Sequence, residues 1–147
     1  MDVLGFATII VLGFTGCAEF GSWAFVHPVL WRLPVEHHLP VEQGLLRTFG
    51  RVMPFLMVGS SVLAITYAIA GPPISETTGM LRCSASIAVG IAVLTTVIVN
   101  VPINLQTGRM PEDDPPDDWV EIRKRWEWFQ GLRSILLVLG FVLECAA

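Results

Sequence analysis

Four apolar segments dominate this chain of 147 residues, and each approaches the size needed to cross a lipid bilayer. A membrane-spanning helix needs about 20 apolar residues. The first segment, Val3–Val26, is interrupted only by Glu19, while the second and third, Val52–Ala70 and Cys83–Val101, carry no charged residue. These three segments predict transmembrane helices.

The fourth segment is less regular, because its uncharged run, Ser134–Leu143, has only ten residues. A helix there either lies flat on the membrane surface or spans from about Trp126 to Ala147 with Arg133 at membrane depth. On a helical projection, one stripe about 80° wide collects polar and aromatic residues, namely Trp119, Arg123, Trp126, Gln130, Arg133 and Leu137. Such a stripe suits a bundle interior better than lipid. We therefore predict that the fourth helix spans.

The composition agrees with a membrane protein. Hydrophobic residues make up 53% of the chain and charged residues 15%, whereas soluble domains carry about a quarter charged residues. The predicted fold is an all-α integral membrane four-helix bundle, a single domain over residues 1–147. Its fourth helix is extended by an amphipathic cytoplasmic end that starts after Asp118, the expected N-cap, with Glu121 three residues on. The net charge of −4 and the lack of a basic cluster interleaved with aromatics argue against nucleic acid as a partner.

Basic residues are distributed unevenly over the loops. Seven of them flank the first and third loops, and the second loop has Arg82 alone; the seven are Arg32, Arg47, Arg51, Arg109, Arg123, Lys124 and Arg125. The positive-inside rule places these two loops in the cytoplasm and both termini outside.

Polar residues gather at the cytoplasmic end of all four predicted helices. The third helix is expected to end in the sequence NVPIN (residues 100–104), where Pro102 stops the helix and frees backbone carbonyls. The first helix ends near His27, and the second begins with Arg47 and Arg51 on one face. The pattern predicts a polar pocket, with Asn100 and Asn104 forming one wall. These asparagines are alternatively explained as caps that bond between helices.

Glu19, Trp23 and His27 share one face of the first helix at a spacing of four residues. An unpaired carboxylate at the depth of Glu19 is costly, so we expect an ion pair with Arg51 or Arg133. This pair is either a clamp between helices or part of a reactive site, and His27 is either an interfacial residue or a reactive one. The pair His37-His38 is expected in a loop. No metal site is predicted, because these side chains have no recognisable ligand spacing.

Several motifs together resemble the fungal anthrone oxygenases, which belong to a broad membrane family of bacteria and fungi. They are NVPIN, the downstream pattern of Trp119, Arg123, Arg125, Trp126, Gln130 and Arg133, the early FVHPVLWRLP (residues 25–34) and MPFLM (residues 53–57). The resemblance covers nearly the whole chain. In the family that the chain resembles, the position of Gln130 is often His or Asn. If that His is the base, glutamine cannot replace it, and His27 or Glu19 would have to serve.

The resemblance implies oxidation of an anthrone or similar polyketide to a quinone, with dioxygen as co-substrate and no cofactor. His27 is the predicted base, tuned or replaced by Glu19. Arg51, Arg133 and Asn100 would stabilise the anion and peroxide. The substrate would be a hydrophobic small molecule, bound by Trp23 and Trp126 as a sandwich and by other polar or aromatic residues, namely Arg47, Asn104, Gln130, Arg123 and Trp119.

Two alternatives remain open from the sequence. The same pocket could catalyse cyclisation or isomerisation of a polyketide without oxygen. The protein could instead be a non-catalytic accessory subunit or a small transporter, and stripes of small residues such as those in residues 59–71 could pack the bundle or form a homo-oligomer in the bilayer.

Overall fold

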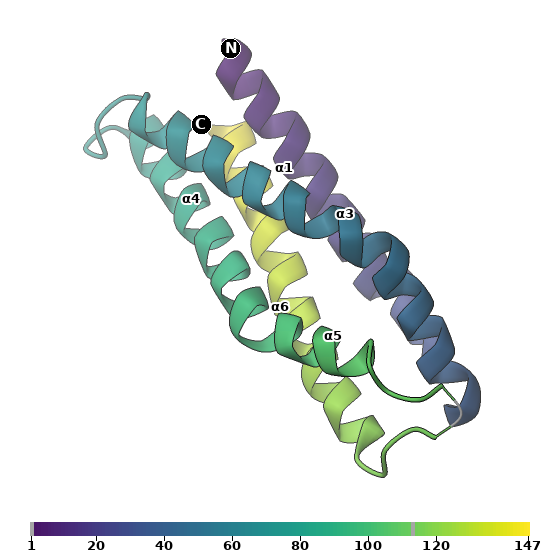
Figure 1. The fold of residues 1–147 in the computed structure, drawn as a ribbon. Helices are drawn as coiled ribbons and strands as arrows, with labels where there is room; N and C mark the ends of the chain where they lie inside the picture. The colour runs from purple at the N-terminus through teal and green to yellow at the C-terminus, as the bar shows by residue number, and fades with distance from the viewer. Residues whose placement is uncertain (1, 113) are drawn as a thin grey trace.

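The computed structural model describes residues 2–112 and 114–147, and within them the chain is a four-helix bundle without strands (Figure 1). The first arm comprises α1 (Val3–Gly21), the π-helical turn η1 (Ser22–Val26) and α2 (His27–Leu30). The long α3 (Val35–Ile69) forms the second arm. The third comprises α4 (Thr77–Thr95), the π-helical turn η2 (Thr96–Asn100) and α5 (Val101–Thr107), and the fourth is α6 (Trp119–Ala146).

The four arms alternate in direction, so that both ends of the chain lie at one end of the bundle (Figure 1). α1 and α4 each pack against both α3 and α6. In the described part of the chain, four helical spans are long and apolar enough to cross a membrane: Val3–Leu30, Glu36–Ile69, Thr77–Thr107 and Trp119–Ala146. This confirms the predicted fold class, including a fourth helix of spanning length.

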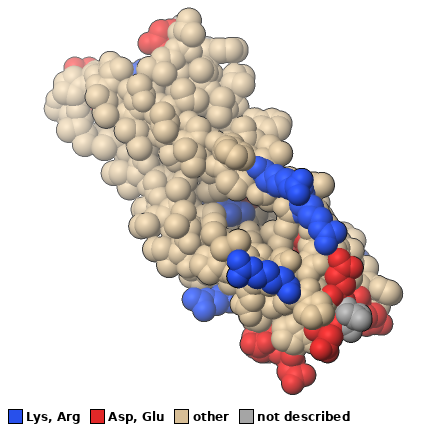
Figure 2. Space-filling model, in the orientation of Figure 1, with Lys and Arg blue, Asp and Glu red and all other residues tan. Residues whose placement is uncertain are grey.

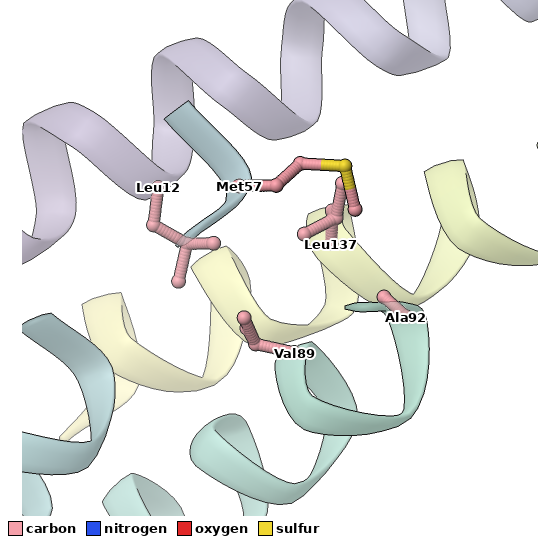
Figure 3. Packing of buried hydrophobic residues seen from close by; sticks show 5 residues of the cluster. All are labelled: Leu12, Met57, Val89, Ala92 and Leu137. Carbon is pink, nitrogen blue, oxygen red and sulfur yellow. The ribbon is translucent and has the colours of Figure 1, made fainter. Parts of the chain in front are cut away.

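The half of the bundle near the termini is closely packed. Its core contains Leu12, Met57, Val89, Ala92 and Leu137, one or two from each arm (Figure 3). Glycines let the helices approach one another: a Cβ at position 16 would lie 3.2 Å from the backbone carbon of Leu137. Small residues at such contacts are typical of helix packing in membranes.

The first and third arms share an unexpected feature, a π-helical turn directly before a proline-containing segment. The N–H of His27 donates to the carbonyl of Ser22, and the N–H of Val101 donates to the carbonyl of Thr96, both across five residues. A proline in a helix removes one backbone donor and crowds the preceding turn, and a wider turn accommodates it. The prediction that Pro102 ends the helix is therefore wrong, because the helix continues to Thr107.

The second arm is much longer than its apolar run. Helix α3 begins at Val35 rather than Val52, so His37 and His38 lie in a helix and the prediction of a loop is wrong. The additional turns mix charged and polar residues with apolar ones, and hydropathy therefore does not detect them. Gln43 in these turns donates through Nε2 to the carbonyls of Thr107 and Met110, at 2.9 and 2.8 Å, and so fixes the third loop to α3.

The fourth arm begins where expected, with Asp118 at its N-cap position. The side chain of Asp118 makes no capping hydrogen bond, so the proposed capping box is absent at this helix start.

Candidate active site

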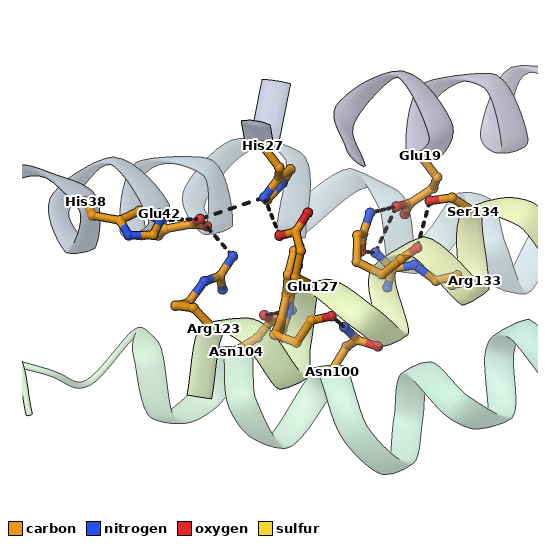
Figure 4. Close-up of polar contacts among 12 residues, drawn as sticks. Glu19, His27, His38, Glu42, Asn100, Asn104, Arg123, Glu127, Arg133 and Ser134 are labelled. Carbon is orange, nitrogen blue, oxygen red and sulfur yellow. Dashed lines mark hydrogen bonds and ion pairs between the residues drawn. The ribbon is translucent and has the colours of Figure 1, made fainter. Parts of the chain in front are cut away.

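A buried ion pair joins the first and fourth arms in the middle of the bundle. Arg133 donates to Glu19 Oε2 at 2.8 Å, and Gln130 Nε2 donates to the same oxygen at 2.6 Å (Figure 4). Arg133 also donates to Gln130 Oε1. Glu19 is fully buried. A charged carboxylate at this depth is stable only when it is paired with an opposite charge. Of the two predicted partners the structure selects Arg133.

A second buried ion pair lies closer to the third loop. Arg123 of α6 donates to Glu42 Oε1 of α3 at 2.7 Å, and both side chains are almost completely buried. His38 Nε2 lies 3.3 Å from the same carboxylate oxygen. The guanidinium of Arg123 stands over the ring of Trp126, 4.1 Å from its centroid. This pair therefore links α3 to α6 as Glu19 and Arg133 link α1 to α6.

His27 lies between the two ion pairs and faces two carboxylates through one nitrogen. Its Nδ1 is 3.1 Å from Glu127 Oε2 and 3.8 Å from Glu42 Oε1 (Figure 4). The ring stacks on Trp126 with a centroid separation of 4.9 Å and an interplanar angle of 28°. Neither His27 Nδ1 nor Glu127 Oε2 has a hydrogen-bond partner among the described residues, so the contact brings a carboxylate close to one ring nitrogen without fixing the tautomer of His27.

The two asparagines of NVPIN hold Trp126 in place. Asn100 Nδ2 donates to the backbone carbonyl of Trp126 at 3.2 Å, and Asn104 Oδ1 accepts from the indole Nε1 at 2.6 Å. Asn100 is fully buried, and its Oδ1 has no hydrogen-bond partner among the described residues. The structure thus shows a contact of Asn100 with Trp126, and its role toward a reacting anion stays a prediction.

A cavity lies among these groups, and its interior volume is about 140 Å³. Six of the twelve predicted site residues line it: Glu19, His27, Asn104, Trp126, Gln130 and Arg133. Most of the remaining wall is apolar and comes from α3, including Met53 and Met57. Figure 2 shows a recess that contains basic atoms and has further basic side chains on the surface beside it, and Arg133 is the arginine that lines the cavity.

Several polar atoms at this site lack a hydrogen-bond partner among the described residues. They include Glu19 Oε1 and Arg133 Nε, which belong to residues of the cavity wall. Buried polar groups are normally satisfied. A bound molecule with an acidic hydroxyl and a carbonyl or phenolate oxygen would supply the missing partners.

Two predicted arginines lie outside this cavity. Arg47 and Arg51 are both exposed, and Arg47 pairs with Glu112 at 3.2 Å near the third loop. They border a separate groove together with Arg109. Their shared helix face was predicted correctly, but that face points outward.

Three other predicted residues, Trp119, Arg123 and Trp23, do not line the cavity. Trp119 is buried with its edge against His38, at a centroid distance of 5.6 Å, and Arg123 is buried in its ion pair. Trp23 packs on Gly131 and lines a different cleft. The predicted sandwich of a substrate between Trp23 and Trp126 is therefore wrong, because His27 already occupies one face of Trp126.

Sequence reasoning missed three members of the site: His38, Glu42 and Glu127. His38 and Glu42 are separated by four residues, the spacing of an ion pair on one helix face, but α3 was not predicted to extend so far. Glu127 follows Arg123 by four residues, at the edge of the polar stripe of α6. Within the described residues, no group of three or more His, Cys, Asp or Glu side chains is arranged to hold a metal ion.

The fold and the site together define a four-helix bundle of membrane-spanning length with a polar cavity among its helices. The model of the anthrone oxygenase family matches residues 45–143, more than half of the chain. The chain therefore belongs to the anthrone oxygenase family. No curated protein and no solved structure gives a significant match.

Proposed function

We propose that the protein is a membrane-embedded oxygenase that converts an anthrone or a similar hydrophobic phenol to a quinone with dioxygen. The observation that carries the proposal is the cavity of this anthrone oxygenase family member, which combines a histidine close to a carboxylate with a buried arginine. The first can remove a proton, and the second can stabilise the anion that forms.

The first proposed step is removal of a proton from the methylene carbon of the anthrone by Nε2 of His27. Glu127 stabilises the resulting imidazolium from the Nδ1 side, where the two groups lie 3.1 Å apart. Glu42 is paired with Arg123 at 2.7 Å, so Glu127 is the nearer carboxylate that can form a hydrogen bond to Nδ1 once the ring is protonated. A base with a carboxylate next to its second nitrogen resembles part of a catalytic triad.

Arg133 stabilises the anion in the proposed mechanism. Deprotonation moves negative charge onto the anthrone oxygen, and the Nε–H of Arg133 is available to donate to it. Glu19 keeps the guanidinium in place, and its free oxygen can accept a phenolic hydroxyl of the substrate. Oriented donors in a site shielded from water are the strongest form of such stabilisation.

The anion then reacts with dioxygen, and the atoms balance without a further reagent. One electron passes from the anion to dioxygen, and the two radicals combine to form a carbon–oxygen bond. The peroxide takes the proton from His27. His27 then removes the second hydrogen of the same carbon, the O–O bond breaks, and hydroxide leaves and is protonated to water. The electrons come from the substrate, so the proposed reaction uses no cofactor.

We further propose that the first and third loops are cytoplasmic and that both termini lie outside. The support is the excess of Lys and Arg around those loops. Arg47, Arg51 and Arg109 are exposed in the structure and therefore count toward this rule, whereas Arg123 and Arg133 are held in buried ion pairs.

The test is simultaneous measurement of oxygen uptake and quinone formation by the purified, detergent-solubilised protein with emodin anthrone. The proposal predicts one dioxygen consumed per quinone, at a rate well above spontaneous oxidation. Conversion of the substrate without oxygen uptake would instead favour a cyclase or isomerase. A lack of any conversion would favour a non-catalytic role.

A further inference from the structure

We infer that the ligand of this cavity enters sideways from the hydrocarbon of the bilayer, through a mouth between the middle of α3 and the segment η2–α5. This inference rests on the proposed function only in taking the cavity as the substrate site. It adds the direction of entry and names the residues that control it.

The mouth is defined by residues that line the cavity and are also exposed on the outside of the bundle. On α3 these are Pro54 and Val58, and on the opposite side they are Val97 and Val101. Val58 and Val97 are 58% and 57% exposed. A side chain that contacts both the cavity and the exterior must lie at the opening between them. These rim residues are uncharged, while basic side chains lie on the surface beside the recess in Figure 2.

The depth of the mouth places it within the apolar part of the bundle. No charged residue occurs between Cys83 and Gly108, and none occurs between Val52 and Ala70. Val58 follows Arg51 by seven residues, which is about 10 Å along a helix. If Arg51 lies at the level of the lipid headgroups, as an exposed arginine at the end of an apolar run does, the mouth opens into hydrocarbon.

The rim of the cavity is apolar and its floor is charged, as expected for a site that takes its substrate from the membrane. The rim is apolar, so a flat aromatic molecule can pass without leaving an apolar environment. The floor carries Glu19 and Arg133, which become accessible only after entry. Gly50 and Pro54 on α3 provide little side chain to close the gap. The occupant is therefore a planar apolar molecule with a polar end that reaches the ion pair.

A second route is possible along the surface groove next to the mouth. That groove contains Arg47, Arg51 and Arg109 and shares Pro54 and Val101 with the cavity wall. A ligand arriving from the aqueous interface would pass these arginines. The experiment below separates the two routes.

The test measures how fast anthraquinone binds to the protein in phosphatidylcholine vesicles, by quenching of tryptophan fluorescence without turnover. Anthraquinone is supplied from protein-free vesicles of the same lipid. The difference between the wild type and Trp126→Phe identifies the signal from the cavity, because Trp126 is part of its wall. The variants are Val58→Phe and Val97→Phe, alone and together.

The matched control is Val62→Phe. Val62 lies one helical turn from Val58 and is also 58% exposed, but it does not line the cavity. A second control, Arg51→Gln with Arg109→Gln, tests the route along the groove. Because all of these side chains are exposed, the substitutions leave the packed core unchanged.

We expect the double rim variant to slow binding about tenfold and both controls to bind at the wild-type rate. If the wild type binds and the rim variants bind as fast as Val62→Phe, the lateral mouth is excluded while the proposed function survives. If binding is slowed by the arginine substitutions and not by the rim substitutions, the lateral mouth is also excluded, and entry along the groove is favoured. No cavity signal in the wild type would contradict the proposed function and the mouth together.

Discussion

The two halves of the bundle are built from the same four arms but packed in opposite ways. Near the termini, Leu12, Val89 and Leu137 close the interior with apolar side chains, and glycines bring the backbones together. Toward the first and third loops, two buried ion pairs lie beside a smaller apolar cluster of Val99, Ile103 and Trp126, and a cavity opens next to them. The comparison indicates that the half near the termini holds the helices together, which allows the half near the loops to contain a cavity.

The π-helical turns lie at the boundary between the two halves. η1 and η2 follow the straight helices α1 and α4 and precede Pro28 and Pro102. Such turns often occur at functional sites. Here they change the direction in which the following residues point, and His27 and Asn100 occur directly at their ends.

The largest expected effect is that of Arg133→Leu, which removes half of the deep ion pair. Turnover of emodin anthrone should be abolished. The protein should also lose about 3–5 kcal/mol of stability, because Glu19 is left buried without a partner. Both effects can be measured on one preparation, as oxygen uptake and as thermal unfolding in detergent.

The double variant Glu19→Leu/Arg133→Leu separates these two effects. It removes both charges and should recover most of the lost stability, while turnover stays absent. Full activity in either variant would contradict the role given to Arg133. A double variant as unstable as the single one would show that the pair does not act as a unit.

The next effect in size is that of Glu127→Gln, which keeps the shape of the side chain but removes its charge. If Glu127 stabilises the imidazolium of His27, kcat should fall about 100-fold with KM nearly unchanged. The control is Glu121→Gln, an exposed position six residues earlier on α6. Equal kcat values for the two variants would remove Glu127 from the mechanism.

The smallest effect belongs to the packed half. In Gly16→Ala, the new Cβ would lie 3.2 and 3.3 Å from the backbone carbon and oxygen of Leu137. Since backbone atoms cannot move aside as side chains do, we expect a loss of about 1–3 kcal/mol in thermal unfolding. Turnover per folded molecule should fall far less than in Arg133→Leu, because neither Gly16 nor Leu137 lines the cavity.

The control for this prediction is Gly59→Ala, where a Cβ would meet nothing within 4 Å. Alanine favours a helix over glycine, so this variant should be at least as stable as the wild type. Equal destabilisation by both substitutions would mean that glycine contacts do not hold this half together.

The helices and the convergence of polar residues could be predicted from the sequence, because hydropathy and helical spacing report directly on them. Helix α3 exceeded its prediction because its first turns, before Arg47, mix charged and polar residues with apolar ones and so form no continuous apolar run. The pairing of Glu19 with Arg133 followed from the cost of burying charge. That argument could not choose between Arg133 and Arg51.

The errors in the site have a geometric cause. Spacing shows which residues share a helix face but not where the face points, and Arg47 and Arg51 point outward. Trp23 lies within η1, where the wider turn changes the rotation per residue, so Trp23 and His27 do not line the same cavity. The π-helical turns themselves have no clear signal in the sequence apart from the prolines that follow them.

The most direct test of the proposed reaction is turnover of emodin anthrone under ¹⁸O₂, with mass spectrometry of the quinone. The account predicts one labelled oxygen per quinone and a rate of labelled product far above that of Glu19→Leu/Arg133→Leu. The rate in the double variant also measures spontaneous oxidation. Quinone without label, or labelled quinone formed equally fast by both proteins, would contradict an oxygenase site in this cavity.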